Sequence, residues 1–405
     1  MLSMRTLFLL TMLCACLCGL AQYKNDNVLY KTVFVEDLCR QIRSNPNAVL
    51  LDVRSQGEYD DTSRFYSLNI GRLKNTIHLD IDSMTNHWRE LLPYKDKPLY
   101  VMCSHSQRSR RVSKMLADSG FTNIVNVNGG LTTYNLYFNA ANTCGLYETH
   151  NGFKLISPLN LCEFLSANKD LFILDVRKDS AFQGISTDER LNAHGVINGS
   201  VNIPLATLRN STDGVPKDRK ILVVDNFGAD AGQAASILAG KGFTDVNVLF
   251  NGLETFESNG AACMNRIINS SIKYKILPAD DFDALMHKRS DVVLVDVRPA
   301  EEFNNQSKQT WRNGGHIRNA VNVPLTEFDQ RIGSLGAAKD KPVVVYHFSS
   351  GSSDPYAAAK KLTAMGYSNV YVLQTGVFGL RWRAANIKGK SQLKDYVIDV
   401  PADNL

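Results

Sequence analysis

Apolar residues in this chain follow two alternating patterns. Some form short continuous runs, such as Ala48 to Leu51. Elsewhere they recur at helical spacing: within 110–119, Val112, Met115 and Leu116 stand at positions i, i+3 and i+4. Continuous apolar strands separated by helices are typical of a mostly parallel sheet that is buried on both faces. The pattern therefore predicts an α/β fold with helices on both faces of a central sheet.

The whole pattern occurs three times, at a period of about 122 residues, which is one domain per repeat rather than a solenoid unit. Each copy has an Asp-Val-Arg triplet, an aromatic residue seven positions after its Asp, a Gly-x-Ile-like element and a closing Gly. The triplets begin at Asp52, Asp175 and Asp296, and the aromatic residues are Tyr59, Phe182 and Phe303. The Gly-x-Ile-like elements begin at Gly71, Gly195 and Gly315, and the closing residues are Gly130, Gly252 and Gly376. We therefore expect three tandem domains, at residues 22–150, 151–270 and 271–405.

Residues 1–21 have a different character. Arg5 is followed by an uncharged apolar run from Leu7 to Leu20, with small residues before a potential cleavage site after Ala21. This arrangement is typical of a secretory signal peptide, and the run is shorter than the roughly 20 residues of a membrane span. Leu13 to Cys16 also resembles a bacterial lipoprotein site, which would leave Cys16 acylated. Either interpretation predicts a periplasmic or secreted protein without a membrane span.

Composition adds little to this picture. The net charge is +5 over 405 residues, and Lys and Arg form no run outside Arg108 to Arg111. Nucleic-acid binding is therefore not expected.

A cysteine follows the second long apolar run of the first repeat. The run Leu99 to Met102 leads into Cys103-Ser104-His105-Ser106-Gln107-Arg108-Ser109 and then a helix. A thiol at the end of a strand, before a helix N-terminus, faces backbone N–H donors and the positive end of the helix dipole. Such surroundings favour a thiolate and bind anions. Arg108 would add a cation with several hydrogen-bond donors.

Together, the Asp-Val-Arg strand end, the Gly-x-Ile-like element, the Cys-x4-Arg-Ser loop and the closing Gly-Leu resemble the rhodanese (thiosulfate sulfurtransferase) family, over residues 30 to 400. The resemblance implies that Cys103 accepts sulfur from a small anionic donor as a persulfide and passes it to a thiol or cyanide-like acceptor. It implies substrate binding by Ser104, His105, Ser106, Gln107, Arg108 and Ser109, without a cofactor. Ser106 departs from the family, which usually has Gly at that place. Related phosphatases have a longer Cys-x5-Arg loop, so phosphatase activity is not favoured.

The other two repeats lack the cysteine. Asp225 occupies its place in the second repeat, where a carboxylate would repel an anionic donor and no Arg follows. His347 occupies it in the third, in a loop two residues longer, and no second metal ligand is evident nearby, so no metal site is expected. These domains are interpreted as inactive copies that pack, shape access to Cys103 or bind a partner protein. A non-enzymatic scaffold is therefore the alternative function. The Asp and Arg of each triplet are expected to pair with each other structurally.

The remaining cysteines follow the repeat. Cys39 and Cys162 each lie 13 residues before the triplet Asp, while Cys144 and Cys263 lie after the closing Gly, and the third repeat has neither member. This joint presence and absence predicts disulfides Cys39–Cys144 and Cys162–Cys263, with Cys103 left as the free thiol. An exported protein would allow such bonds. Four unpaired buried thiols remain the alternative.

Overall fold

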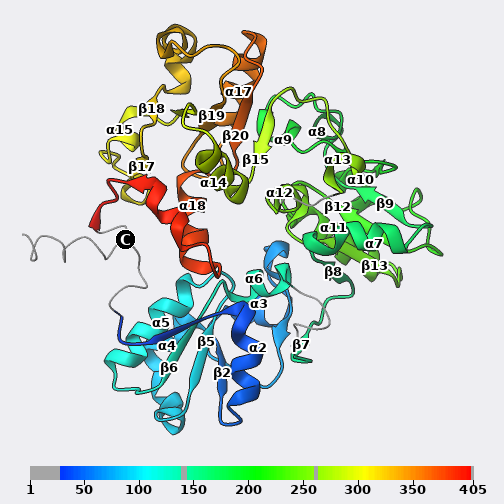
Figure 1. Cartoon of the computed structure of the whole chain (residues 1–405). Helices are drawn as coiled ribbons and strands as arrows, with labels where there is room; N and C mark the ends of the chain where they lie inside the picture. Colours follow the sequence, from blue (N-terminus) through cyan, green and yellow to red (C-terminus); the bar gives the residue numbers. More distant parts are fainter. Residues whose placement is uncertain (1–27, 138–143, 260–262, 403–405) are drawn as a thin grey trace, which may run out of the picture.

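The computed structural model describes residues 28–137, 144–259 and 263–402 and contains three similar α/β domains, named here domains 1, 2 and 3. The proposed signal peptide and Cys16 lie outside the described residues. Figure 1 shows the three domains arranged around a common centre. No helix in the described ranges has the length and apolar character needed to cross a bilayer.

Each domain has a five-stranded parallel sheet with one strand order. The orders are β1-β6-β5-β2-β4, β8-β13-β12-β9-β11 and β15-β20-β19-β16-β18. The strands of domain 1 are β1 (Lys31–Phe34), β2 (Val49–Asp52), β4 (Thr76–His78), β5 (Leu99–Met102) and β6 (Ile124–Asn128). Those of domain 2 are β8 (Lys154–Ile156), β9 (Phe172–Asp175), β11 (Val201–Asn202), β12 (Ile221–Val224) and β13 (Val246–Leu249). Those of domain 3 are β15 (Lys275–Leu277), β16 (Val293–Asp296), β18 (Val321–Asn322), β19 (Val343–Tyr346) and β20 (Val370–Leu373).

Helices cover both faces of each sheet. In domain 1 they are α2 (Val35–Ser44), α3 (Gln56–Tyr59), η1 (Tyr66–Leu68), α4 (Ile81–His87), η2 (Trp88–Tyr94), α5 (Gln107–Asp118) and α6 (Gly130–Leu136). In domain 2 they are η3 (Pro158–Asn160), α7 (Leu161–Ala167), α8 (Asp179–Phe182), α9 (Glu189–Asn192), α10 (Leu205–Asn210), α11 (Ala229–Gly240), α12 (Gly252–Ser258) and α13 (Met264–Ile267). In domain 3 they are α14 (Ala279–Lys288), α15 (Ala300–Phe303), η4 (Thr310–Arg312), η5 (Leu325–Glu327), α16 (Phe328–Arg331), η6 (Ile332–Leu335), α17 (Asp354–Ala364), α18 (Gly376–Asn386) and η7 (Ser391–Tyr396).

A short antiparallel pair closes each domain. The pairs are β3 (Arg72–Leu73) with β7 (Tyr147–Glu148), β10 (Val196–Ile197) with β14 (Ile268–Asn269), and β17 (His316–Ile317) with β21 (Val397–Ile398). The central strands are buried on both faces; all four residues of β5, for example, are buried. This is the continuous apolar pattern that the sequence predicts for a parallel sheet.

The Asp-Val-Arg triplets are structural, as the sequence predicts. The Asp52 side chain is 1% exposed, and its carboxylate accepts hydrogen bonds from Nε and an Nη of Arg54. The guanidinium also donates to the carbonyl of Gly71, at 2.9 Å. The same bonds recur at Arg177 with Gly195 and at Arg298 with Gly315. Each buried ion pair thus ties the end of one strand to the Gly-x-Ile-like element of its own domain.

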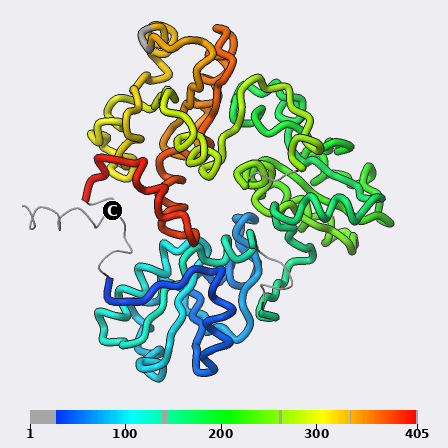
Figure 2. Tube along the Cα trace, viewed as in Figure 1, coloured from blue at the N-terminus to red at the C-terminus, as the bar shows by residue number. Residues whose placement is uncertain are grey.

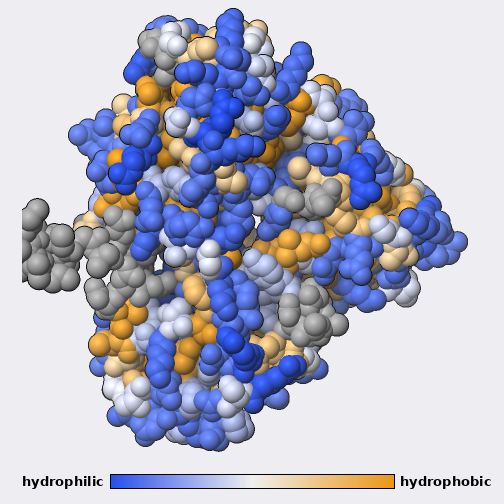
Figure 3. Space-filling model, viewed as in Figure 1, coloured by the Kyte–Doolittle hydropathy of each residue, from blue (hydrophilic) through white to orange (hydrophobic). Residues whose placement is uncertain are grey.

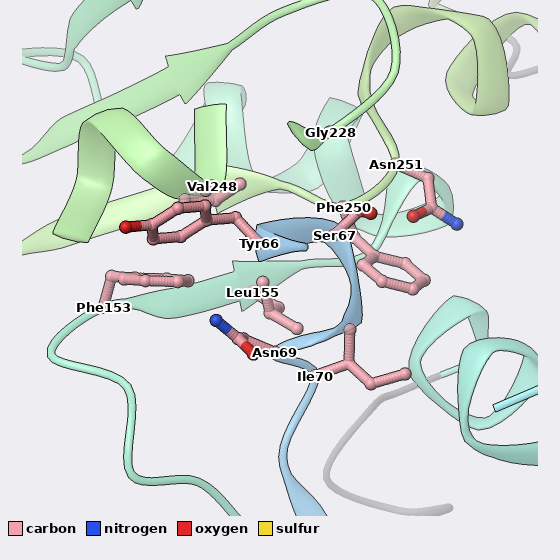
Figure 4. A pocket seen from close by; sticks show the side chains of 11 residues that line it. Tyr66, Ser67, Asn69, Ile70, Phe153, Leu155, Gly228, Val248, Phe250 and Asn251 are labelled. Carbon is pink, nitrogen blue, oxygen red and sulfur yellow. The ribbon is translucent and has the colours of Figure 1, made fainter. Parts of the chain in front are cut away.

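Each domain also packs against its neighbours. Figure 4 shows η1 of domain 1 against domain 2, with Tyr66 and Ile70 beside Phe153, Leu155 and Phe250. Domain 2 meets domain 3 through α9 and α17, which are joined by an ion pair between Glu189 and Lys360. Domain 3 returns to domain 1 through the end of α18: Arg110 donates to Asn386 at 2.5 Å, and Asn128 donates to the carbonyl of Ala385 at 2.6 Å. The tube in Figure 2 shows the same arrangement, with the C-terminal end of α18 close to domain 1.

Candidate functional site

Cys103 follows the last residue of β5, at the carboxyl edge of the sheet in domain 1. Its side chain is almost completely buried, with 1% of the residue exposed, and its Sγ lies 3.6 Å from the Oγ of Ser109. Ligand sites in open α/β sheets lie outside the carboxyl ends of strands. Among the described residues, Cys103 is the free cysteine.

Ser106 adopts the left-handed conformation for which the family usually has Gly. Its φ is 76°, and the helix α5 begins at the next residue. Its buried hydroxyl accepts a hydrogen bond from the backbone N–H of Gly129, at 2.5 Å. In domain 2, Gly228 has the equivalent conformation, with a φ of 85°. The hydrogen bond to Gly129 offsets some of the strain that a side chain causes in this conformation, roughly 1–2 kcal/mol.

The hydroxyl of Ser109 also forms a hydrogen bond within domain 1, in which it donates to Oδ1 of Asn126 at 2.7 Å. Both Ser106 and Ser109 are fully buried. Their hydroxyl groups therefore fix the loop, and an anion at Cys103 would meet their backbone N–H groups.

In domain 2, the backbone N–H groups of the equivalent loop bind a carboxylate. The buried carboxylate of Asp225 accepts hydrogen bonds from the backbone N–H groups of Gly228, Asp230 and Ala231, at 2.5, 2.8 and 3.1 Å. Burial raises the pKa of Asp225 to about 6, although these hydrogen bonds oppose the shift. In the repeat register, the donors correspond to the N–H groups of Ser106, Arg108 and Ser109. Domain 2 thus fills this cradle of N–H donors with its own carboxylate, whereas the equivalent place in domain 1 holds Cys103.

Arg108 is engaged with a carboxylate that the sequence analysis did not identify. Its two terminal nitrogens donate to the oxygens of Glu58, at 2.5 and 2.8 Å, and one also donates to Oγ of Ser104, at 2.9 Å. The Glu58 side chain is 3% exposed and closes a capping box with Ser55. Burial raises the pKa of Glu58, but hydrogen bonds and the charge of Arg108 outweigh burial and lower it overall. The repeat contains a signal for this residue, since Glu302 occupies the same place six residues after Asp296.

His105 and Gln107 have exposed side chains at the loop surface. His105 lies between two hydroxyl groups: Nδ1 is 3.0 Å from Oγ of Ser104, and Nε2 is 3.1 Å from Oγ1 of Thr132. Part of the side chain faces solvent, but the protein atoms around the ring partly desolvate it. This desolvation, together with the nearby charge of Arg108, lowers the pKa of His105. The imidazole is therefore uncharged at neutral pH.

The closing Gly of each repeat packs against the loop that follows the central strand of its domain. A Cβ on Gly130 would lie 2.3 Å from the carbonyl oxygen of Cys103, so this place accepts only Gly. The following N–H groups of Leu131 and Thr132 donate to the carbonyls of Cys103 and Ser104, at 2.9 and 3.0 Å. Gly252 and Gly376 make the equivalent close approaches in the other domains. The closing Gly and the residues after it thus fix the backbone of the loop that begins at Cys103 in domain 1.

The loop of domain 3 offers a buried, uncharged imidazole. Burial lowers the pKa of His347 to about 4. Its Nε2 lies 3.7 Å from a carboxylate oxygen of Asp354. Across the described parts of the chain, no group of three or more His, Cys, Asp or Glu side chains is placed to hold a metal ion.

The other four cysteines of the described residues are joined in the pairs that the repeat register predicts. The structure has disulfides between Cys39 and Cys144 and between Cys162 and Cys263, with sequence separations of 105 and 101. Each links the first helix of a domain to the segment after its closing helix. Neither disulfide involves the Cys103 loop.

Comparison with known proteins supports three equivalent domains. Residues 35–136, 160–259 and 278–381 each match the family model of the rhodanese-like domain, and together they cover more than half of the chain. The uncharacterized protein YibN of Escherichia coli K12 is 32% identical over 116 residues, covering 28% of this chain and 71% of YibN. The thiosulfate sulfurtransferase GlpE of Pseudomonas syringae pv. syringae is 36% identical over 91 residues, covering 22% of this chain and 76% of GlpE.

Among solved structures, a thiosulfate sulfurtransferase from Pseudomonas aeruginosa aligns with 84% of this chain and 66% of its own, at 14% identity and a TM-score of 0.23. Each family match includes four of the five strands of one parallel sheet, together with the loop that contains Cys103, Asp225 or His347. This chain therefore belongs to the rhodanese-like domain family, with three copies of the domain in one polypeptide.

Proposed function

We propose that this chain is an exported sulfurtransferase that carries a sulfane sulfur on Cys103. The family and its relatives named as sulfurtransferases support sulfur transfer in general. The observation that carries the proposal is the loop of domain 2, where three backbone N–H groups bind a carboxylate. The same backbone in domain 1 surrounds a cysteine, so it would stabilise an anionic sulfur at that place.

The reaction has two steps. The Cys103 thiolate attacks the outer sulfur of thiosulfate, a new S–S bond forms, and the S–S bond of thiosulfate breaks as sulfite leaves with the electron pair. An acceptor such as cyanide or a thiolate then attacks the terminal sulfur of the persulfide. The Cys103–sulfur bond breaks, and Cys103 leaves as the thiolate. The N–H groups of the loop stabilise the negative charge on sulfur in the Cys103 thiolate and in the persulfide.

The contacts of Arg108 support a positioning role rather than a direct bond to the donor. Both of its terminal nitrogens donate to Glu58, and one also holds Ser104. The buried ion pair fixes the start of α5 against α3 and thereby fixes the N–H groups that face Cys103. Because Cys103 is 1% exposed, binding of the donor requires side chains at the loop surface to move.

Export is part of the proposal and depends on residues 1–21, which have the pattern of a signal peptide. The two disulfides are consistent with an oxidising compartment, either periplasmic or extracellular. Acylation at Cys16 is the alternative form of export. Mass spectrometry of the protein isolated from its source would distinguish cleavage after Ala21 from a lipid on Cys16.

The test is thiocyanate formation from thiosulfate and cyanide by the mature chain. We expect Cys103→Ser to abolish turnover and persulfide formation, because the hydroxyl is not a nucleophile for sulfur. His347→Gln is the matched control at the equivalent place of domain 3, and we expect it to leave turnover unchanged. If wild type and Cys103→Ser behave alike, and no donor forms a persulfide on Cys103, the enzyme proposal fails.

That failure would favour a second function, a scaffold in which domains 2 and 3 bind a partner protein. Its supporting observation is that neither of the other loops has a cysteine: Asp225 binds the N–H groups of its own loop, and a buried His347 takes the place in domain 3. A pull-down with the Cys103→Ser variant that recovers one stoichiometric partner, in the absence of any turnover, would support it.

A further inference from the structure

A cavity lies where the three domains meet. Its volume is about 330 Å³, and all three domains contribute to its wall. Figure 3 shows the surface hollowed at this junction, and Figure 1 shows the helices α6, α12 and α18 around it. A cavity of this size is within the range of small-molecule sites, about 300–1,000 Å³.

The wall is built from equivalent positions of the repeat. In each domain, the helix after the closing Gly turns the same face toward the cavity, with its second, third and sixth residues after that Gly. The second is Thr132, Glu254 or Phe378, and the sixth is Leu136, Ser258 or Trp382. Equivalent faces of the three helices thus form three chemically different walls: hydroxyl and aliphatic in domain 1, acidic in domain 2 and aromatic in domain 3.

The charges of the wall balance. Glu254 and Arg383 carry opposite charges on different helices, and each already has a partner: Arg190 at 3.1 Å and Asp280 at 3.3 Å. His105, also in the wall, is uncharged at neutral pH because burial and Arg108 lower its pKa. Because the wall carries one charge of each sign, a ligand with a single charge would meet as much repulsion as attraction there. A ligand that carries both charges can place each of its ends beside the group of opposite sign.

The aromatic residues of the wall restrict the class of ligand further. Phe378 is 49% exposed, and Trp382 lines the cavity one helical turn away. Aromatic faces attract ammonium groups, by about 0.5–2 kcal/mol, and the Glu254 carboxylate is in the same wall. Arg383, beside Trp382, offers donors to a carboxylate. The cavity thus presents groups suited to both ends of a zwitterion.

We propose that the central cavity is a binding site for a small zwitterionic molecule of the amino-acid type. The site adjoins the Cys103 loop, since the Thr132 hydroxyl in its wall contacts His105, which in turn contacts Ser104. Binding does not depend on sulfur transfer and can be measured in the Cys103→Ser variant.

The test compares ligands that differ in charge. Isothermal titration calorimetry of the Cys103→Ser chain would use L-cysteine and L-methionine as zwitterions, cysteamine as a cation and 3-mercaptopropionate as an anion. We expect at least one zwitterion to bind at least tenfold more tightly than both charged analogues. We also expect Trp382→Leu and Glu254→Gln, each added to Cys103→Ser, to weaken that binding at least fivefold. Phe65→Ala and Glu327→Gln, which change exposed residues outside the cavity, are the matched controls and should leave it unchanged.

Thermal melting in the absence of ligand shows whether each variant is folded. Trp382→Phe, which keeps an aromatic face, should retain binding within threefold if Trp382→Leu melts early. The proposal is overturned if neither zwitterion binds, if the charged analogues bind equally well, or if folded Trp382 and Glu254 variants bind like the controls. Because Cys103 is absent throughout, none of these outcomes bears on sulfur transfer by Cys103.

Discussion

The pair of Arg108 and Glu58 allows a quantitative test of what the arginine does. Replacing Arg108 with Gln leaves a carboxylate that is 3% exposed without its cation, while Ser55 continues to hydrogen-bond it. Removal of one partner of a buried ion pair typically costs about 3–5 kcal/mol. Glu58→Gln should cost less, about 1–2 kcal/mol, since the Arg108 side chain is 26% exposed and water can solvate it. The double variant leaves neither charge unpaired and should lie within about 1–2 kcal/mol of wild type.

The assay is a double-mutant cycle by urea unfolding, with thiocyanate formation measured on the same four proteins. We expect a coupling free energy of at least about 2 kcal/mol. Because the guanidinium is engaged with Glu58 and Ser104, we also expect the double variant to recover kcat/KM for thiosulfate to within about threefold of wild type. A coupling below about 1 kcal/mol would refute the structural argument. A stable double variant whose KM for thiosulfate is raised tenfold or more would show instead that Arg108 binds the donor directly.

Three further predictions follow from particular contacts. Ser106→Gly should change the unfolding free energy by less than about 1 kcal/mol, because relief of left-handed strain (about 1–2 kcal/mol) offsets the loss of the hydrogen bond to Gly129; a loss above about 2 kcal/mol would contradict this. Since the folded pKa of Asp225, about 6, exceeds its ordinary 3.8, its contribution to stability is full below pH 4 and is lost as pH rises through 6. Relative to Asp225→Asn, wild type should therefore lose about 3 kcal/mol between pH 4 and pH 7, and parallel pH profiles of unfolding would exclude this. Replacing Cys162 and Cys263 together with Ser should lower stability by up to about 4.7 kcal/mol while turnover at low temperature stays within twofold, and a selective loss of turnover would show that the disulfide shapes the site.

Many features of this structure can be predicted from short sequence patterns and from the repeat. The run Leu99 to Met102 coincides with strand β5, because a strand buried on both faces must be apolar throughout. The triplet beginning at Asp52 recurs because a buried Arg54 needs a carboxylate two residues away, and the repeat register alone groups Cys39 with Cys144. Fold class, repeat number, disulfide pairs and the place of Cys103 all follow from such local or periodic constraints.

The remaining features needed the tertiary structure, because they depend on contacts between segments distant in sequence. Glu58 meets Arg108 across 50 positions, and this ion pair could not be read from the spacing of the loop residues. Asp225 was expected to repel an anion, and the structure shows in addition that it occupies the N–H cradle itself. The central cavity exists only because three equivalent helices meet, and no periodicity within one domain specifies how domains pack. The elements of each domain follow from local apolar patterns, because each strand and helix buries residues that are close in sequence. The surroundings of Cys103 depend on packing between segments far apart in sequence, within domain 1 and between domains, and only the tertiary structure decides them.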